Sequence, residues 1–119
     1  MTVKELYDSF GGDYNYAIQT MMSDDFIKKM LLKFVQNNTF ENVIKSYENK
    51  DYRGVFDASH SLKGVCGNLS LTPLFKKASV VCEATRFSTN NDNINLDKEI
   101  EELKQCYKDI YTSLSNYLL

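Results

Sequence analysis

The stretch SHSLKGVCGNL, residues 59–69, contains the single histidine of the chain and decides how the chain folds. Drawn as an α-helix with about 100° per residue, it separates into two faces. One face has the i, i+3, i+4, i+7 spacing of a buried stripe. Its members are Val55, Leu62, Val65, Cys66 and Leu69. His60 lies about 160° from Leu62 on this wheel, so we expect its imidazole to point into solvent.

The face around the histidine combines a cation with residues that lack side chains. Its members are Arg53, Phe56, His60, Lys63, Gly64 and Gly67. Glycine inside a helix costs about 0.5–1 kcal/mol relative to alanine. Two glycines beside an exposed histidine therefore indicate a surface kept low so that a bulky group can reach the ring. Close helix packing at Gly64 and Gly67 is the alternative, which their predicted outward position disfavours.

Two short helices are expected before residue 23. Residues 2–5 have the spacing of a capping box for a helix that ends near Gly11, and Asp13 can cap a second helix. Ser23, followed by two acidic residues, is a good N-cap for a third helix. The apolar stripe of this third helix comprises Phe26, Ile27, Met30, Leu31, Phe34 and Val35. Its phase slips at residues 37–39, which predicts a kink or a break, with Asn38 as a new N-cap.

Three further helices complete the chain. The histidine helix is expected from about Asp51 to Leu69, with Gly54 inside it for no evident reason. Thr72 as N-cap and Pro73 at the first helical position predict a restart that runs to about Arg86. Residues 88–93 form a polar loop. The last helix, from about residue 96 to 117, has apolar residues at alternating spacings of four and three, which is typical of bundle packing, with a coiled-coil partner as the alternative.

These elements predict an all-α protein whose core is an antiparallel four-helix bundle. We expect residues 1–119 to form one domain, in which residues 1–22 are the short N-terminal helices and residues 23–119 the helical bundle. A chain of 119 residues is long enough to build a single core without metal or disulfide staples.

The net charge and the cysteines restrict the classes of protein to which this chain can belong. The net charge of −2 predicts no strong field for nucleic acid or membranes, and no apolar run approaches the length of about 20 residues that spans a bilayer. The charged first ten residues do not resemble a signal peptide, so we expect a cytoplasmic protein. Cys66, Cys82 and Cys106 lie on different predicted helices without zinc-site spacing, which indicates reduced, buried thiols and no metal site.

The motif His60-Ser61-Leu62-Lys63-Gly64, followed by Asn68-Leu69, resembles the histidine-containing phosphotransfer (HPt) domain. The resemblance extends from about Asp24 to Arg86 with helices in the expected order. One departure is Ser70, at a turn position where the family usually has glycine.

The HPt resemblance implies a phosphorelay intermediate of two-component signalling. His60 would accept a phosphoryl group from the aspartyl phosphate of a receiver domain and pass it to another receiver. Lys63 and Arg86 would stabilise the phosphate, although either residue could instead be an ordinary solvated charge. Phe56, Gly64 and Gly67 would contribute to receiver docking. The protein would not be an enzyme by itself and would be a monomer without a cofactor of its own, since the receiver supplies Mg²⁺.

The residues themselves agree with this chemistry. An exposed imidazole is a nucleophile at neutral pH, and Lys63 lies one helical turn after His60, where its ammonium can approach phosphate oxygens. The chain has no Walker-type loop, so we do not expect it to take phosphate from ATP.

Rival functions belong to other classes. A Cys–His hydrolase is excluded because His60 and Cys66 are six residues apart, about 120° around the helix, and a single histidine also excludes a catalytic triad within one chain. A non-catalytic adaptor that binds receivers or kinases stays open, as does a kinase-fed phosphotransfer module of a larger signalling protein. The start at Met1 and the length of the last predicted helix favour a free-standing protein.

Overall fold

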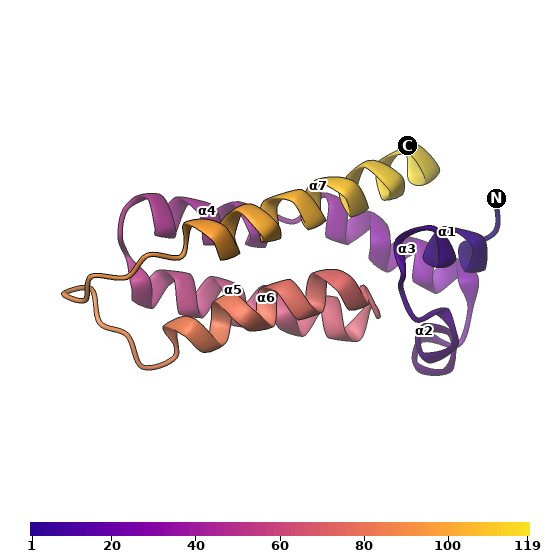
Figure 1. The fold of residues 1–119 in the computed structure, drawn as a ribbon. Helices are drawn as coiled ribbons and strands as arrows, with labels where there is room; N and C mark the ends of the chain where they lie inside the picture. The colour runs from indigo at the N-terminus through magenta and orange to yellow at the C-terminus, as the bar shows by residue number, and fades with distance from the viewer.

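The computed structural model describes residues 1–119 as seven α-helices without a strand (Figure 1). The helices are α1 (Val3–Phe10), α2 (Tyr14–Met21), α3 (Asp24–Val35), α4 (Thr39–Glu48), α5 (Tyr52–Asn68), α6 (Thr72–Thr85) and α7 (Asp97–Leu118). The molecule is elongated, with extents of 47 × 24 × 20 Å, and both termini lie at the end that carries α1 and α2. The prediction of an all-α protein is confirmed.

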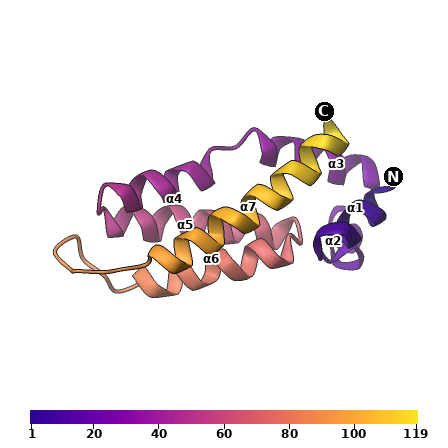
Figure 2. The ribbon, with the colours of Figure 1, turned by 45° about the horizontal axis from the view of Figure 1, so that its top comes forward.

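The long helices form a bundle. The chain runs along α3 and α4, returns along α5, and then reverses again at α6 and α7 (Figures 1 and 2). Helix α4 packs against α5, α5 against α6, and α6 against α7, while α3 closes the bundle against α7. One side of the bundle is therefore formed by two consecutive helices, α3 and α4.

The N-terminal residues 1–22, called the N-terminal unit below, share the core of the bundle. Val3, Leu6, Tyr7 and Ala17 belong to the same buried cluster as the long helices. The buried Tyr7 hydroxyl donates a hydrogen bond of 2.7 Å to the Leu69 carbonyl. The Asp13 amide donates one of 3.1 Å to the Ser70 carbonyl. These bonds fasten the N-terminal unit to the turn between α5 and α6.

The first three helices begin at the predicted caps. The Thr2 side chain and Glu5 form a capping box, and α1 ends at Gly11, whose φ of 81° is in the left-handed region. Asp13 caps α2 and Ser23 caps α3 by accepting a hydrogen bond from an amide of the first turn.

The phase slip after Val35 is a break between helices. Helix α3 ends at Val35 and α4 begins at Thr39. Asn38 occupies the N-cap position but makes no capping bond through its side chain, so that part of the prediction is wrong. The Asn37 side chain accepts a hydrogen bond from the Thr39 amide instead. This local Asx-type turn satisfies the first amide of α4 from the residue before the N-cap.

Helix α6 begins one residue earlier than predicted. Thr72 is its first residue, Leu71 occupies the N-cap position, and Pro73 follows within the first turn. The Thr72 hydroxyl donates to the Ser70 carbonyl at 3.4 Å, which turns it away from a capping role. Proline is still tolerated there because the first-turn amides have no intrahelical acceptor.

Gly54 makes room for the N-cap of the histidine helix. Its amide donates a 3.0 Å hydrogen bond to the Asp51 carboxylate, which caps α5. A Cβ atom at this position would lie 2.8 Å from the Ser46 hydroxyl and also collide with the Asp51 carboxylate. A side chain here would therefore push the capping group away from the helix end.

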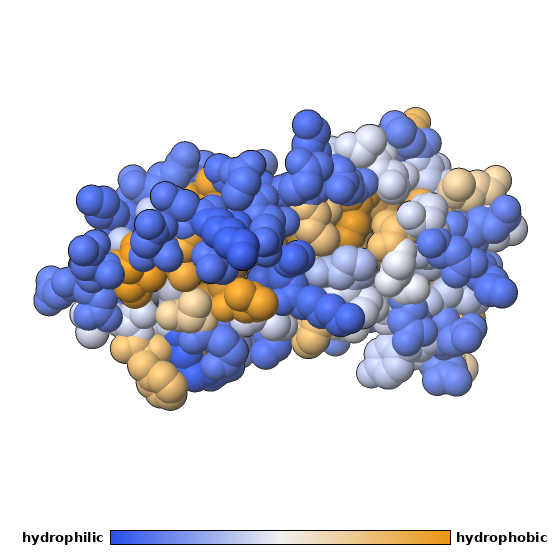
Figure 3. All heavy atoms as spheres, in the orientation of Figure 1, coloured by the Kyte–Doolittle hydropathy of each residue, from blue (hydrophilic) through white to orange (hydrophobic).

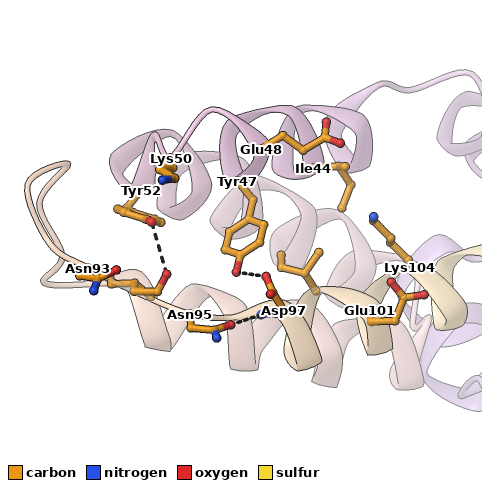
Figure 4. A pocket seen from close by; sticks show the side chains of 12 residues that line it. Ile44, Tyr47, Glu48, Lys50, Tyr52, Asn93, Asn95, Asp97, Glu101 and Lys104 are labelled. Atoms are coloured by element: carbon orange, nitrogen blue, oxygen red, sulfur yellow. Dashed lines mark hydrogen bonds between the residues drawn. The ribbon is translucent and has the colours of Figure 1, made fainter.

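The loop of residues 87–96 is tied to the bundle by two tyrosines (Figure 4). The Tyr47 hydroxyl donates to the Asp97 carboxylate at 2.6 Å and accepts from the Leu96 amide at 2.8 Å. Tyr52 donates to the Ile94 carbonyl at 3.3 Å. The residues that make these contacts line a polar hollow between α4 and the start of α7.

The outer surface is mostly hydrophilic on the face seen in Figure 3, with apolar atoms in separate small areas. None of the seven helices combines the length and apolar character that a membrane crossing requires.

Candidate functional site

His60 lies on the outward face of α5, as the helical wheel predicts. It is exposed, whereas Leu62 on the opposite face is 2% exposed and Cys66 is fully buried. Val65, expected within the stripe, is half-buried at its edge. The imidazole is therefore open to a partner while the same helix supplies the core.

Phe56 lies next to His60 and contacts two cations. Its ring centroid is 5.8 Å from that of His60, with the planes tilted by 35°. The guanidinium carbon of Arg53 is 5.0 Å from the Phe56 ring centroid, and that of Arg86 is 5.5 Å from it. Both distances are in the range of cation–π contacts. One aromatic ring thus contacts the imidazole and two positive charges.

Arg53 is held by backbone carbonyls at the end of α6. Its guanidinium donates to the Arg86 carbonyl at 3.0 Å and to the Ser88 carbonyl at 3.3 Å. The Arg53 amide donates to the Asn90 side chain at 3.1 Å. Arg53 therefore ties α5 to the segment that follows α6. No local sequence signal indicates this structural role, because the acceptors are main-chain atoms over 30 residues away.

Arg86 is paired with Glu83 one turn earlier on α6. Its Nη2 atom lies 2.7 Å from one carboxylate oxygen, and its Nε atom lies 3.0 and 3.2 Å from the two oxygens. The hydrogen bonds from Arg86 hold the pKa of Glu83 below its ordinary value, and the charges of Arg86 and Lys63 add to this effect. The same bonds raise the pKa of Arg86. The pair is mostly open to water, with 35% of the Arg86 and 61% of the Glu83 side chain exposed.

Lys63 follows His60 by one turn and leans toward α6. Its ammonium nitrogen is 5.9 Å from the centroid of the Phe75 ring. The ammonium is thus near the histidine surface, and it attracts Glu83. Two cations with flexible side chains border the face of His60, and each rests on another group of the protein.

The two glycines predicted to give clearance differ in their surroundings. A Cβ atom at Gly64 would meet no heavy atom within 4 Å, so the space above this position is open. A Cβ atom at Gly67 would lie 3.4 Å from the Phe75 ring, an ordinary van der Waals contact. Gly64 leaves the surface beside His60 low, whereas a Cβ atom at Gly67 would fit against the Phe75 ring, so the packing of α6 does not require glycine there.

An apolar hollow of about 470 Å³ opens on the α3 side of this face. Phe26 and Met30 of α3 line it opposite Val65, Asn68 and Leu69 of α5. Phe26 is 44% exposed, so its predicted place in the core stripe is wrong. Phe26 and Ile27 are adjacent and hence about 100° apart on the helix, and the core accommodates only Ile27, which is fully buried.

The cysteines lie away from His60. Cys66 and Cys82 are buried, Cys106 is half-buried, and all three are free thiols. Burial raises the pKa of the Cys66 thiol far above its ordinary value. A thiol in such a site stays protonated and is a poor nucleophile. No three His, Cys, Asp or Glu side chains are grouped so that they could hold a metal ion.

Comparison of the chain with protein-family models, curated proteins and solved structures finds no match. The case for a function therefore rests on the site residues and on the motif around His60.

Proposed function

We propose that this protein is a phosphorelay intermediate of the HPt type, in which His60 carries a phosphoryl group between receiver domains. The observation that carries the proposal is an exposed imidazole on a helix of the bundle, with open space above Gly64 and cations on the adjoining turns. A surface helix that needed only stability would have alanine at Gly64, since nothing occupies the space of its side chain.

The transfer step requires little from this chain beyond access and charge. The unprotonated ring nitrogen, which the HPt resemblance places at Nε2, attacks the phosphorus of an aspartyl phosphate. A P–N bond forms, the acyl P–O bond breaks, and the aspartate carboxylate of the receiver leaves. Positioning and electrostatic stabilisation supply most of the catalysis of phosphoryl transfer. Lys63 and Arg86 would pair with the phosphoryl oxygens, while the receiver brings the Mg²⁺.

The docking surface for the receiver would surround His60 on α5. Phe56 and Gly64 lie next to the imidazole, Gly67 lies one turn beyond, and the hollow lined by Phe26 and Met30 borders the same helix. An apolar area beside a charged one is the arrangement that specific interfaces use, with burial for affinity and charge for orientation. The expected partners are receiver domains, alone or within a hybrid sensor kinase.

Phosphotransfer from a panel of labelled, phosphorylated receivers tests the proposal. We expect label on the wild-type protein, stable to base and labile to acid, and none on His60→Gln. Lys63→Ala should slow the transfer several-fold, whereas Lys108→Ala on α7 serves as the matched control for loss of a positive charge. Binding of receivers without transfer would instead identify an adaptor. Label from isolated kinase domains alone would identify a kinase-fed module.

A further inference from the structure

Glu83 occupies an unusual place beside the proposed phosphate site. It forms one of only two ion pairs in the structure, the other being Lys77–Glu102 between α6 and α7. An exposed pair three residues apart on one helix adds little to stability. Its main effect is to determine where the Arg86 guanidinium lies.

The carboxylate of Glu83 binds Arg86 directly and attracts Lys63 of α5 without forming an ion pair with it. Three hydrogen bonds of 2.7–3.2 Å hold Arg86, whose guanidinium rests against the Phe56 ring next to His60. Lys63 also attracts Glu83 from α5. A phosphoryl group on His60 would therefore compete with Glu83 for Arg86, which already has an anionic partner, and for the charge of Lys63, which Glu83 attracts more weakly.

We propose that Glu83 is a positioning residue that competes with the phosphoryl group on His60 for Arg86 and Lys63, so that the group is held less tightly and is passed on more readily. This inference rests on the proposed phosphotransfer function. A dianionic phosphoryl group attracts a guanidinium more strongly than a carboxylate does. Phosphorylation would draw Arg86 from Glu83, and return of the guanidinium to Glu83 would accompany departure of the phosphoryl group.

Asp57 provides the matched control. It lies one turn before His60 on the same helix, is exposed, and forms no ion pair. Asp57→Asn and Glu83→Gln each remove one negative charge from the surroundings of the phosphoryl group. Only Glu83→Gln releases Arg86, so competition and simple repulsion can be told apart.

Phosphoramidate provides a probe that needs no partner protein. The imidazole attacks its phosphorus, a P–N bond to the ring forms, the P–N bond to the amine breaks, and ammonia leaves with the proton that the ring loses. ³¹P NMR then follows the ionisation of the phosphoryl group on His60 as the pH is varied. Cations that pair with the dianion lower its pKa.

We expect Glu83→Gln to lower the phosphoryl pKa by about 0.3–0.7, which corresponds to a two- to fivefold gain in pairing with the dianion. Glu83→Asp should restore wild-type behaviour at least in part, and Asp57→Asn should have a smaller effect. In a Lys63→Gln/Arg86→Gln background, the effect of Glu83→Gln should shrink to that of Asp57→Asn. With a receiver that exchanges phosphate, Glu83→Gln should shift the equilibrium toward phosphorylated His60 by the same factor.

An unchanged phosphoryl pKa in Glu83→Gln would overturn the inference, as would a shift that persists at full size without Lys63 and Arg86. Failure of every receiver to phosphorylate the wild-type protein would contradict the proposed function instead, and the titration would still decide whether Glu83 competes for the cations. Failure of phosphoramidate to modify His60 would contradict both proposals, because each requires an accessible imidazole.

Discussion

His60 and Leu62 are two positions apart on α5, and one is exposed while the other is buried. The imidazole is exposed on the face that carries Lys63 and Gly64, whereas Leu62 is 2% exposed and belongs to the bundle core. The chemistry proposed for His60 and the packing of the core thus lie on different faces of one helix. Substitutions on the two faces should affect different measurements.

Leu62→Ala should destabilise the protein by about 2–5 kcal/mol, because it leaves a cavity in a packed core. His60→Gln should change the free energy of unfolding by less than about 0.5 kcal/mol, because its side chain is exposed. Urea denaturation followed by circular dichroism measures both values. A large loss of stability in His60→Gln would show that the imidazole has a structural role.

Ser70→Gly should stabilise the fold by about 1 kcal/mol. Ser70 adopts a φ of 57°, and its buried hydroxyl has no hydrogen-bond partner. Lys50, with a φ of 56° at an exposed turn, is the matched control, since Lys50→Gly relieves the backbone without removing a buried hydroxyl. Thermal unfolding should rank Ser70→Gly above Lys50→Gly. Equal stabilisation would place the benefit in the backbone alone, and the reverse order would show that the Ser70 hydroxyl stabilises the fold.

At the scale of the element, the two glycines Gly54 and Gly64 have opposite reasons to be small. Gly54 is crowded by the Asp51 cap and the Ser46 hydroxyl, whereas the space above Gly64 is empty. Both lie within α5, so their intrinsic helix propensities are the same. Their replacement by alanine therefore separates local packing from propensity.

Gly54→Ala should destabilise the protein by about 1 kcal/mol, because displacement of the Asp51 cap outweighs the gain in helix propensity. Gly64→Ala should stabilise it by about 0.5–1 kcal/mol. Chemical denaturation of the two variants measures the difference. Equal stabilisation by both would mean that the Asp51 cap contributes nothing to α5.

The sequence predicts most element boundaries because their signals are local. Thr2, Asp13, Ser23 and Gly11 act through atoms a few residues away, and the structure confirms them. The exposure of Phe26 could not be predicted, since it depends on which of two adjacent apolar side chains the other helices cover. The Glu83–Arg86 pair has a readable i, i+3 spacing, but its position beside His60 depends on how α6 packs on α5.

At the scale of the whole molecule, the N-terminal unit is joined to the bundle through a buried phenol. Tyr7 is fully buried and donates its hydroxyl proton to the Leu69 carbonyl at the end of α5. Burial raises the pKa of Tyr7 far above its ordinary value of 10.0 and raises that of Tyr107 to about 12. The folded protein thus keeps tyrosine protons that the unfolded chain releases.

Stability should be constant up to about pH 8 and begin to fall at about pH 9, as the unfolded chain releases the Cys66 proton. It should fall more steeply from about pH 10 toward 12, where the tyrosines of the unfolded chain ionise. In this range the unfolded state binds fewer protons than the folded state, so the free energy of unfolding decreases. Tyr7 alone contributes a slope of up to about 1.4 kcal/mol per pH unit. Urea denaturation at several pH values measures this slope.

Tyr7→Phe is the control for the loss of stability at alkaline pH. It should cost about 1–2 kcal/mol at pH 7, because the Leu69 carbonyl loses its partner. Above pH 10 its stability should decline less steeply than that of the wild type. Parallel pH profiles for the two proteins would contradict the assignment of the slope to Tyr7.

The residues proposed for phosphate chemistry, from Phe56 to Arg86, all lie on a single helical hairpin formed by α5 and α6 and its immediate end. Contacts that are close in sequence form with a small loss of chain entropy and therefore arise early in folding. The surroundings of His60 should thus assemble before α7 completes the bundle. Substitutions that loosen the packing of α7 should therefore lower the stability of the bundle more than they disturb the contacts between α5 and α6.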